Sequence, residues 1–350
     1  MLKTSTHAQG RLAEPVEHGQ DRARGLPRRR LLASALAAGA WPALGALPAR
    51  AGSAEPVRIL VGFPPGGGSD AVARLLADKL KDVLGAPVVV DNRPGAGGQI
   101  AAQVLKAAPA DGATLFLTHD HTISILPLVV KNPGFDPARD FAPVAGFATF
   151  VNAFAVSGGT PAQSFAEYVR WLKTAHGGKS AVGVPAPAST PEFLVGLLGR
   201  RYRLDLVAAP YRGSAPMIGD MLGKQIAAGV GSVQDFIEHH RAGKLRVLAV
   251  LGGSRQAALP DVPTFAELGL QGFEDLPYYG FYAPAGTPPA FIQRFSGALA
   301  QVLVMPDVRD QLIAMGLSVG HMTPEQLAAR EQAYTRVWAR IIRGSGFSAP

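Results

Sequence analysis

The stretch from residue 57 to residue 85 constrains the fold of this chain more than any other. An apolar run at 57–63 leads into a turn at 64–70 with three consecutive glycines, after which apolar residues recur at spacings of three and four up to Gly85. This pattern predicts a buried strand, a glycine loop and a helix. The helix N-terminus would present unpaired N–H groups and a positive dipole end. The stretch therefore predicts an anion site, or alternatively a tight turn that binds nothing.

The glycine loop lacks the signatures of nucleotide-binding loops. No Gly-Lys-Ser/Thr follows it, so no lysine is placed to contact a β- or γ-phosphate. Its glycines, Gly66, Gly67 and Gly68, are contiguous rather than spread as G-x-G-x-x-G. A nucleotide is therefore disfavoured as the ligand.

The first 51 residues have the pattern of an export signal. Residues 27–32 contain paired arginines before two leucines, which resembles a twin-arginine signal, and an Ala/Leu/Gly-rich stretch follows. Two prolines interrupt this stretch, so it is poorly suited to span a membrane. Residues 49–51 match a small-x-small cleavage site. We expect export to the periplasm and cleavage near Ala51; an uncleaved anchor is the alternative, and the long n-region leaves a later start codon open.

Charge and cysteine content exclude several classes of protein. The chain has a formal net charge of +8, but its first 51 residues hold eight of the 34 basic and three of the 26 acidic residues, which leaves +3. No basic run is interleaved with aromatic residues, so we expect no nucleic-acid partner. The chain contains no cysteine, which excludes disulfides and thiolate-bound metals.

The remaining sequence alternates predicted strands with predicted helices. Strands are expected at 87–90, 114–117, 151–156, 181–184, 204–208, 226–230, 245–251 and 279–283, and helices at 99–108, 164–175, 192–201, 215–222, 235–241, 289–304, 308–315 and 324–342. Alternation of this kind predicts mainly parallel sheets with helices on both faces. We expect one domain from 52–155 plus 278–350 and a second from 156–277, with a ligand cleft between them.

Two histidines flank an aspartate where the third predicted strand ends. His119 and His121 could chelate zinc or iron, or act with Asp120 in a hydrolase or lyase. However, no HExxH or comparable motif supplies a third ligand, and no G-x-S-x-G elbow is present. The alternative is a polar loop lining the cleft, where a neutral histidine donates to a carboxylate. We expect no catalytic residue, no metal and no cofactor.

Seven short motifs occur in order along the chain. They are FPPGGGSD at 63–70, VVVDNRPGAGG at 88–98, DPARDFAPV at 136–144, PYRGSAP at 210–216, AGKLR at 242–246, LPDVPT at 259–264 and APAGTP at 283–288. Together they resemble the solute-binding receptors of tripartite tricarboxylate transporters, the Bug family of periplasmic proteins. The resemblance implies a type II periplasmic-binding-protein fold, a small carboxylate or amino acid as ligand, and membrane transporter subunits as partners. A membrane sensor kinase is the alternative partner, and we expect a monomer.

The resemblance also implies which residues bind the ligand. In the family, two facing loops hold a carboxylate largely through main-chain N–H groups and ordered waters, and these loops match 63–70 and 183–190 here. The candidate ligand-binding residues are Phe63, Pro65, Gly66, Gly67, Gly68, Ser69, Asp70, His119, Asp120, His121, Ala186, Ala188, Ser189, Thr190, Gln234, Asp235 and Tyr279. For Asp235 the alternative is a helix cap, and for Tyr279 it is packing.

The chain departs from the family pattern at two places. Residues 185–191 are rich in proline, and Glu192 stands where family members often carry histidine. A Glu192 that faced the pocket would favour a cationic or amphoteric ligand; the alternative is that it complements a helix N-terminus. His119, Asp120 and His121 replace the usual Ser-Asn, so the identity of the ligand is not carried over.

Overall fold

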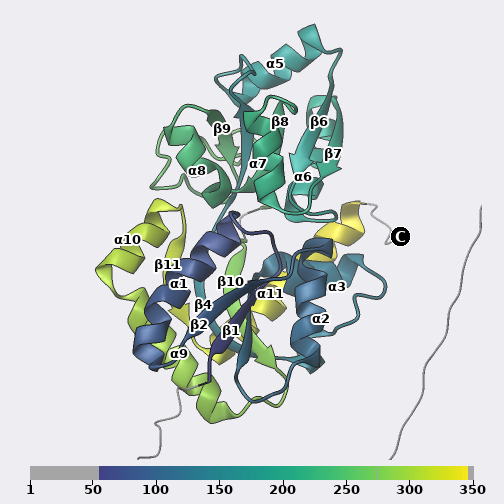
Figure 1. Cartoon of the computed structure of the whole chain (residues 1–350). Helices are drawn as coiled ribbons and strands as arrows, with labels where there is room; N and C mark the ends of the chain where they lie inside the picture. Colours follow the sequence, from purple (N-terminus) through teal and green to yellow (C-terminus); the bar gives the residue numbers. More distant parts are fainter. Residues whose placement is uncertain (1–54, 274, 346–350) are drawn as a thin grey trace, which may run out of the picture. The chain divides into compact units, whose positions relative to one another are not determined.

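The computed structural model describes residues 55–273 and 275–345. The predicted export signal lies outside these described residues. Gly52–Pro350 groups as one compact unit, which contains a sheet of six strands and a sheet of five (Figure 1). The division of this unit into two domains at the expected boundaries stays a prediction.

The larger sheet has the strand order β11-β4-β10-β3-β1-β2. Its strands are β1 (Val57–Val61), β2 (Val88–Asn92), β3 (Thr114–His119), β4 (Phe141–Thr149), β10 (Tyr278–Pro284) and β11 (Ser318–Met322). β1 pairs in parallel with β2 and β3, whereas β10 pairs antiparallel with β3 and β4, and β11 antiparallel with β4. The prediction of a mainly parallel sheet is therefore wrong: β10 and β11 run opposite to the other four strands, so three of the five pairings are antiparallel.

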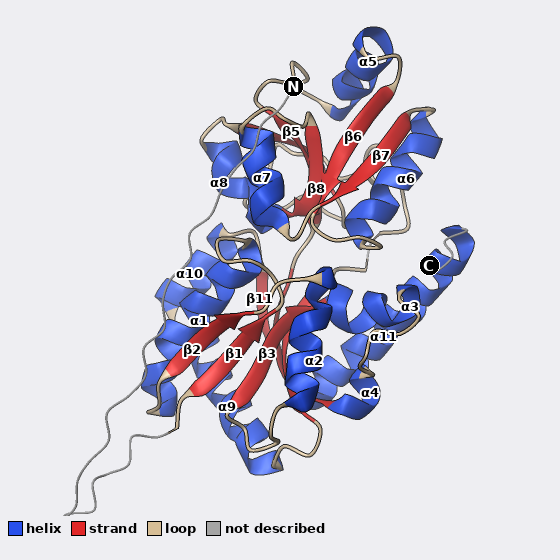
Figure 2. Ribbon diagram, turned by 45° about the vertical axis from the view of Figure 1, so that its right-hand side comes forward, coloured by secondary structure: helices blue, strands red, loops and turns tan. Residues whose placement is uncertain are grey.

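Helices cover both faces of this sheet, as predicted. One face carries α1 (Gly68–Leu84), α9 (Pro289–Leu303) and α10 (Pro306–Ala314), and the other carries α2 (Gln99–Ala107) and α11 (Pro324–Ser345) (Figure 2). Since α9, α10 and α11 follow β10 in the chain, the carboxyl end returns to the first sheet, also as predicted.

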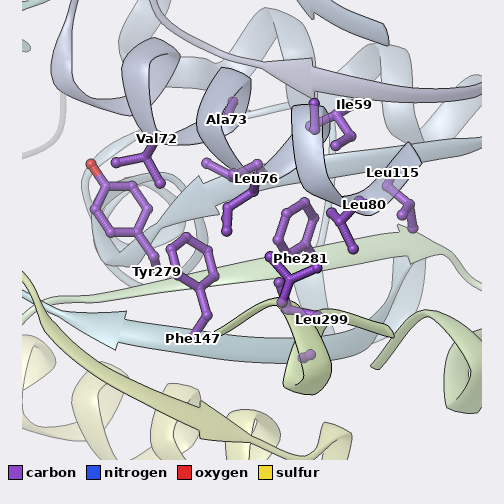
Figure 3. Close-up of a cluster of buried hydrophobic side chains, with 14 of the residues drawn as sticks. Ile59, Val72, Ala73, Leu76, Leu80, Leu115, Phe147, Tyr279, Phe281 and Leu299 are labelled. Atoms are coloured by element: carbon purple, nitrogen blue, oxygen red, sulfur yellow. The ribbon is translucent and has the colours of Figure 1, made fainter. Parts of the chain in front are cut away.

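The alternation of side chains along β1 builds two hydrophobic cores. Ile59 and Val61 belong to the cluster under α1, and Leu60 belongs to the cluster under α2 and α11. Figure 3 shows the buried face of α1, including Leu76 and Leu80, directed at the aromatic and aliphatic side chains of the strands. Each fully buried Leu contributes about 1.5–3 kcal/mol to folding. The core therefore fixes α1 and the loop that precedes it.

The end of α1 confirms the role predicted for Gly85. This residue has φ 63°, in the left-handed region, and its N–H donates to the Lys81 carbonyl. Glycine adopts this conformation without a Cβ clash and closes the last turn of the helix. α1 therefore ends where the sequence indicates.

The smaller sheet has the strand order β7-β6-β8-β5-β9 and is also mixed. Its strands are β5 (Asn152–Ser157), β6 (Lys179–Val184), β7 (Asp205–Pro210), β8 (Ala228–Ser232) and β9 (Leu245–Val250). The helices packed on it are α5 (Phe165–Ala175), α6 (Thr190–Tyr202), α7 (Ser214–Leu222) and α8 (Val233–Arg241). The Ser164 hydroxyl accepts a 3.2 Å hydrogen bond from the Glu167 N–H and caps α5, as the capping-box spacing of Ser164 and Glu167 indicates.

Short helical turns occupy the segment between β3 and β4. They are a π-helical turn at His121–Ile125, followed by α3 (Leu126–Val129) and α4 (Pro137–Asp140). A 3-10 turn at Ala96–Gly98 also precedes α2. His119 therefore ends a strand and His121 begins a helical turn, so the two histidines are held by regular structure rather than by a polar loop.

Candidate functional site

Four helix N-termini line one pocket. The first residues of α1 (Gly68, Ser69), α6 (Thr190), α7 (Ser214) and α8 (Gln234) all contribute to its wall. No lysine or arginine of the described residues lines it. Because the first N–H groups of a helix have no intrahelical acceptor, the wall is rich in neutral donors and in positive dipole ends. The cavity measures about 50 Å³, which is room for a few water molecules.

Asp70 lies behind the first loop and shapes it. Its carboxylate accepts hydrogen bonds from the Gly66 N–H at 2.9 Å, Arg74 Nε at 3.0 Å and Asn92 Nδ2 at 2.9 Å. Burial alone would raise the pKa of Asp70, but these hydrogen bonds outweigh it and hold the pKa below its usual range. Asp70 therefore stays ionised and locks the turn before α1.

Asp235 meets the N-terminus of α1 from the other side of the pocket. Its Oδ1 accepts the Gly68 N–H at 3.0 Å and the Ser214 hydroxyl at 2.8 Å. The residue keeps some exposed surface because it lines the cavity, yet burial of its carboxyl group raises the pKa despite these hydrogen bonds. The chain thus places one of its own carboxylates at a site that favours an anion.

A chain of hydrogen bonds, made by one amide and two hydroxyl groups, crosses the pocket beside Asp235. Gln234 Nε2 donates a short hydrogen bond to the Tyr279 hydroxyl, which lies 3.0 Å from the Ser69 hydroxyl. Burial raises the pKa of Tyr279, so its hydroxyl stays protonated. The Gln234 Oε1 atom is buried and has no partner among the described residues. This acceptor is open to a donor on a ligand.

Aromatic rings surround His119 on the pocket wall. Its ring stacks on Phe63 with centroids 5.0 Å apart and meets Phe150 and Tyr279 edge-on at 5.9 and 5.6 Å. The neighbouring Asp120 is 3% exposed, and its Oδ1 lies 3.4 Å from His119 Nδ1. This separation is longer than a charge-assisted hydrogen bond. Asp120 is therefore a second buried acid in the wall.

His121 is buried and neutral. Burial, followed by the charge of His119, lowers the pKa of His121 from 6.5 to about 4. Its Nδ1 has no partner in the part of the chain that the structure describes. Within residues 55–273 and 275–345, no group of three His, Asp or Glu side chains could hold a metal ion.

The loop before α6 forms the opposite wall. The Ser189 hydroxyl donates to the Ala186 carbonyl at 2.6 Å, and the Thr190 Oγ1, on a residue that is 4% exposed, has no partner among the described residues. Glu192 Oε2 accepts the Ala188 N–H at 2.5 Å, and neither of these two residues lines the pocket. Of the two roles considered for Glu192, the contact with the turn before α6 agrees with the one at a helix N-terminus rather than with the selection of a cationic or amphoteric ligand.

The pocket brings together most of the residues that the sequence nominated. Its wall includes Phe63, Gly67, Gly68, Ser69, His119, Asp120, His121, Ala186, Ser189, Thr190, Gln234, Asp235 and Tyr279. The structure places Pro65, Gly66, Asp70 and Ala188 outside this wall. The Gly66 N–H donates to the Asp70 carboxylate, and the Ala188 N–H donates to the Glu192 carboxylate. These two hydrogen bonds shape the two loops. Contact with a ligand stays a prediction for every residue of the set.

Sequence reasoning missed several wall residues. They are Pro64, Phe150, Asn152, Pro185, Pro191, Ser214 and Ser232. Ser214 stands in the PYRGSAP motif at the start of α7, so the rule that found the first two helix N-termini could also have found this one. Phe150 and Asn152 lie where the chain passes from β4 to β5, and no local pattern marks them.

Comparison with known proteins identifies the family. Residues 72–347 match the model of the tripartite tricarboxylate transporter family receptor. The chain belongs to this receptor family. It is 33% identical over 319 residues to a UPF0065 protein from the tcbD-tcbE intergenic region of Pseudomonas sp. strain P51, covering 90% of this chain and 94% of that protein.

Solved structures of receptors share the fold. The periplasmic binding protein BugD is 30% identical, with a TM-score of 0.78 over 84% of this chain and 98% of BugD. R. palustris Rpa4515 with adipate is 29% identical, with a TM-score of 0.79 over 83% of this chain and 97% of that one. The predicted two-part periplasmic-binding-protein fold is confirmed. The family consists of solute-binding receptors and not of enzymes, so the hydrolase or lyase alternative is wrong.

In the described part of this receptor, no helix is long and apolar enough to cross a bilayer.

Proposed function

We propose that this chain is a periplasmic receptor that captures a small organic carboxylate and delivers it to the membrane subunits of a tripartite tricarboxylate-type transporter. The convergence of the N-termini of α1, α6, α7 and α8 on one pocket carries this proposal. Such termini stabilise an anion through backbone N–H groups and helix dipoles. The adipate bound to the related R. palustris protein supports the same ligand class.

The unpartnered groups in the wall support a ligand with oxygen atoms. Thr190 Oγ1 can donate its proton to a carboxylate, and it is buried without a described partner. A buried hydroxyl without a partner costs about 1–3 kcal/mol, which a bound carboxylate would recover. The ligand would therefore complete a set of hydrogen bonds for which the wall is already arranged.

Capture would proceed by closure of two α/β domains, 52–155 with 278–350 and 156–277, on the ligand. Three contacts join elements of the larger sheet to α8, which packs on the smaller one: Gly68 N–H to Asp235, Gln234 to Tyr279, and Arg241 Nη1 to the Ala314 carbonyl at 3.2 Å. Phe193 of α6 also packs on Trp338 of α11, with ring centroids 5.6 Å apart. These contacts would break and re-form as the domains separate. A ligand that binds only the closed form shifts the receptor towards it, and a transporter that recognises this form couples binding to delivery.

The experiment is a thermal-shift screen of the mature chain, from Gly52 onward, against small carboxylates, amino acids and divalent metals. A ligand that binds only the folded state raises the melting temperature as RT ln(1 + [L]/Kd). We expect a shift with one class of carboxylate. No shift with any acid, confirmed by calorimetry, would contradict the function. Deletion of the gene should then abolish uptake of that acid; loss of induction alone would indicate delivery to a sensor kinase instead.

A further inference from the structure

The pocket contains two acids and no basic side chain among its described wall residues other than histidine. Asp120 is 3% exposed, and Asp235 lies at the N-terminus of α1. Of the two histidines in the wall, His121 is buried and its pKa is lowered to about 4 by that burial, so it is neutral at physiological pH. A dicarboxylate would therefore bring its charges beside two carboxylates that no lysine or arginine of the wall offsets.

The N-terminus of α1 already has an anion. Asp235 Oδ1 takes the Gly68 N–H that a ligand carboxylate would otherwise accept. At α6, Thr190 Oγ1 has no described partner, and Thr190 and Glu192 carry N–H groups without an intrahelical acceptor, whereas Pro191 has no N–H to donate. The pocket therefore offers one place for a carboxylate, at α6, and one that favours positive charge, at Asp235.

The groups around Asp235 can accept hydrogen bonds from a cation. Gln234 Oε1 is buried beside it without a described partner and can only accept. The rings of Phe63, Phe150 and Tyr279 line the same cavity, and aromatic faces attract cations. An N–H-bearing ammonium group satisfies the amide oxygen and neutralises the carboxylate, which a carboxylate or an alkyl group cannot do.

From this arrangement we infer that the ligand is amphoteric, with a protonated amine held by Asp235 and Gln234 Oε1 and a carboxylate held at the N-terminus of α6. The inference rests on the proposed function and narrows its ligand class. It also moves the selection of positive charge from Glu192, which caps a turn, to acids that line the pocket. The small cavity favours a short carbon chain.

The test compares matched pairs of ligands by titration calorimetry on the mature chain. The pairs are γ-aminobutyrate with butyrate, alanine with propionate, and aspartate with succinate, so that only the amine differs. We expect the amine member of the pair that fits to bind about tenfold to hundredfold more tightly, which is the range for a buried charged hydrogen bond. Equal or tighter binding of the member without the amine, in every pair that binds, overturns the inference and leaves the proposed function intact.

Variants of the pocket test whether Asp235 causes the preference for an amine-bearing ligand. D235N keeps a side-chain oxygen for the Gly68 N–H and should reduce the preference for the amine at least tenfold. The matched control is E238Q, which makes the same change of charge on an exposed residue of α8 outside this pocket. If D235N fails to fold, Q234L removes the open acceptor instead and should reduce the preference severalfold. A preference that neither variant changes overturns the assignment. If none of the three amine-bearing ligands binds while the screen finds a carboxylate without an amine that does, the inference is overturned and the proposed function stands.

Discussion

The two halves of the pocket are built differently. On the larger sheet, Ser69, His121 and Tyr279 are at most 8% exposed, and Asp70 holds the loop before Ser69 from behind. On the smaller sheet, Gln234 and Asp235 keep intermediate exposure. The start of α6 is as deeply buried, since Ser189 and Thr190 are 3% and 4% exposed. Within the second half it is therefore α8 that presents partly exposed polar groups to a ligand, and we conclude that the halves differ chiefly in α8.

The strongest way to break this arrangement is to place a side chain where the halves meet. A Cβ on Gly68 would lie 2.5 Å from Gln234 Cγ and 2.8 Å from Asp235 Oδ1. We expect Gly68→Val to weaken ligand binding at least about a thousandfold, or about 4 kcal/mol, because α8 cannot approach α1. The measurement is calorimetric titration with the best ligand of the screen.

The control for this variant is Gly297→Val. Gly297 lies in α9, and a Cβ there would have no neighbour within 4 Å. Both variants should retain a cooperative unfolding transition, because neither site has a left-handed φ that glycine alone tolerates. Undiminished affinity in a folded Gly68→Val protein would show that the two halves do not meet around the ligand.

The buried half should make the protein sensitive to acid. The pKa of His121 is about 4 in the folded state against 6.5 when exposed, so the unfolded chain binds the proton first as the pH falls. Stability is complete above pH 6.5 and is lost between pH 6.5 and pH 4, by about 3 kcal/mol at 1.4 kcal/mol per pKa unit. Urea unfolding at several pH values should show this slope in the wild type and lose it in His121→Gln. An equal slope in both proteins would assign the acid sensitivity elsewhere.

The sequence predicts those parts of the fold whose signals are local. α1 ends at Gly85 because a left-handed residue stops a helix wherever it stands. No strand is predicted at β4, because Pro143 and Gly146 weaken the strand pattern within Phe141–Thr149 and only pairing with β10 and β11 makes this segment a strand. Strand direction likewise depends on how distant segments pair. The mixed sheets could not be read from alternation alone.

The candidate site shows the same limit. Glycine loops and helix starts are local signals, so Gly67, Gly68 and Ser189 were found. The partner of Asp235, however, is Gly68, which stands 167 residues away in the chain. Whether Glu192 faced the pocket depended on the turn at Ala188, which has φ 49°. Sequence reasoning therefore identified which residues are polar and close to a helix start, and not which of them face each other.

A smaller change tests the part of the pocket that α6 contributes. Thr190→Val removes the unpartnered hydroxyl from the start of α6 and keeps the shape of the side chain. We expect about a tenfold loss of affinity for the carboxylate, the value of one hydrogen bond, and little change in the melting temperature of the free protein. Thr174→Val, on the exposed end of α5, is the matched control. If both variants bind like the wild type, the carboxylate does not contact α6.

The smallest effect should follow from Glu192→Gln. If Glu192 only caps the Ala188 turn, the amide oxygen can still accept the Ala188 N–H, and the free energy of unfolding should fall by less than about 1 kcal/mol. Neither the affinity nor the preference for an amine should change, in contrast to D235N. Both substitutions remove one negative charge near the start of a helix that packs on the smaller sheet. A shift in ligand preference with Glu192→Gln as large as that with D235N would mean that overall charge, rather than the contact at the α1 N-terminus, selects the ligand.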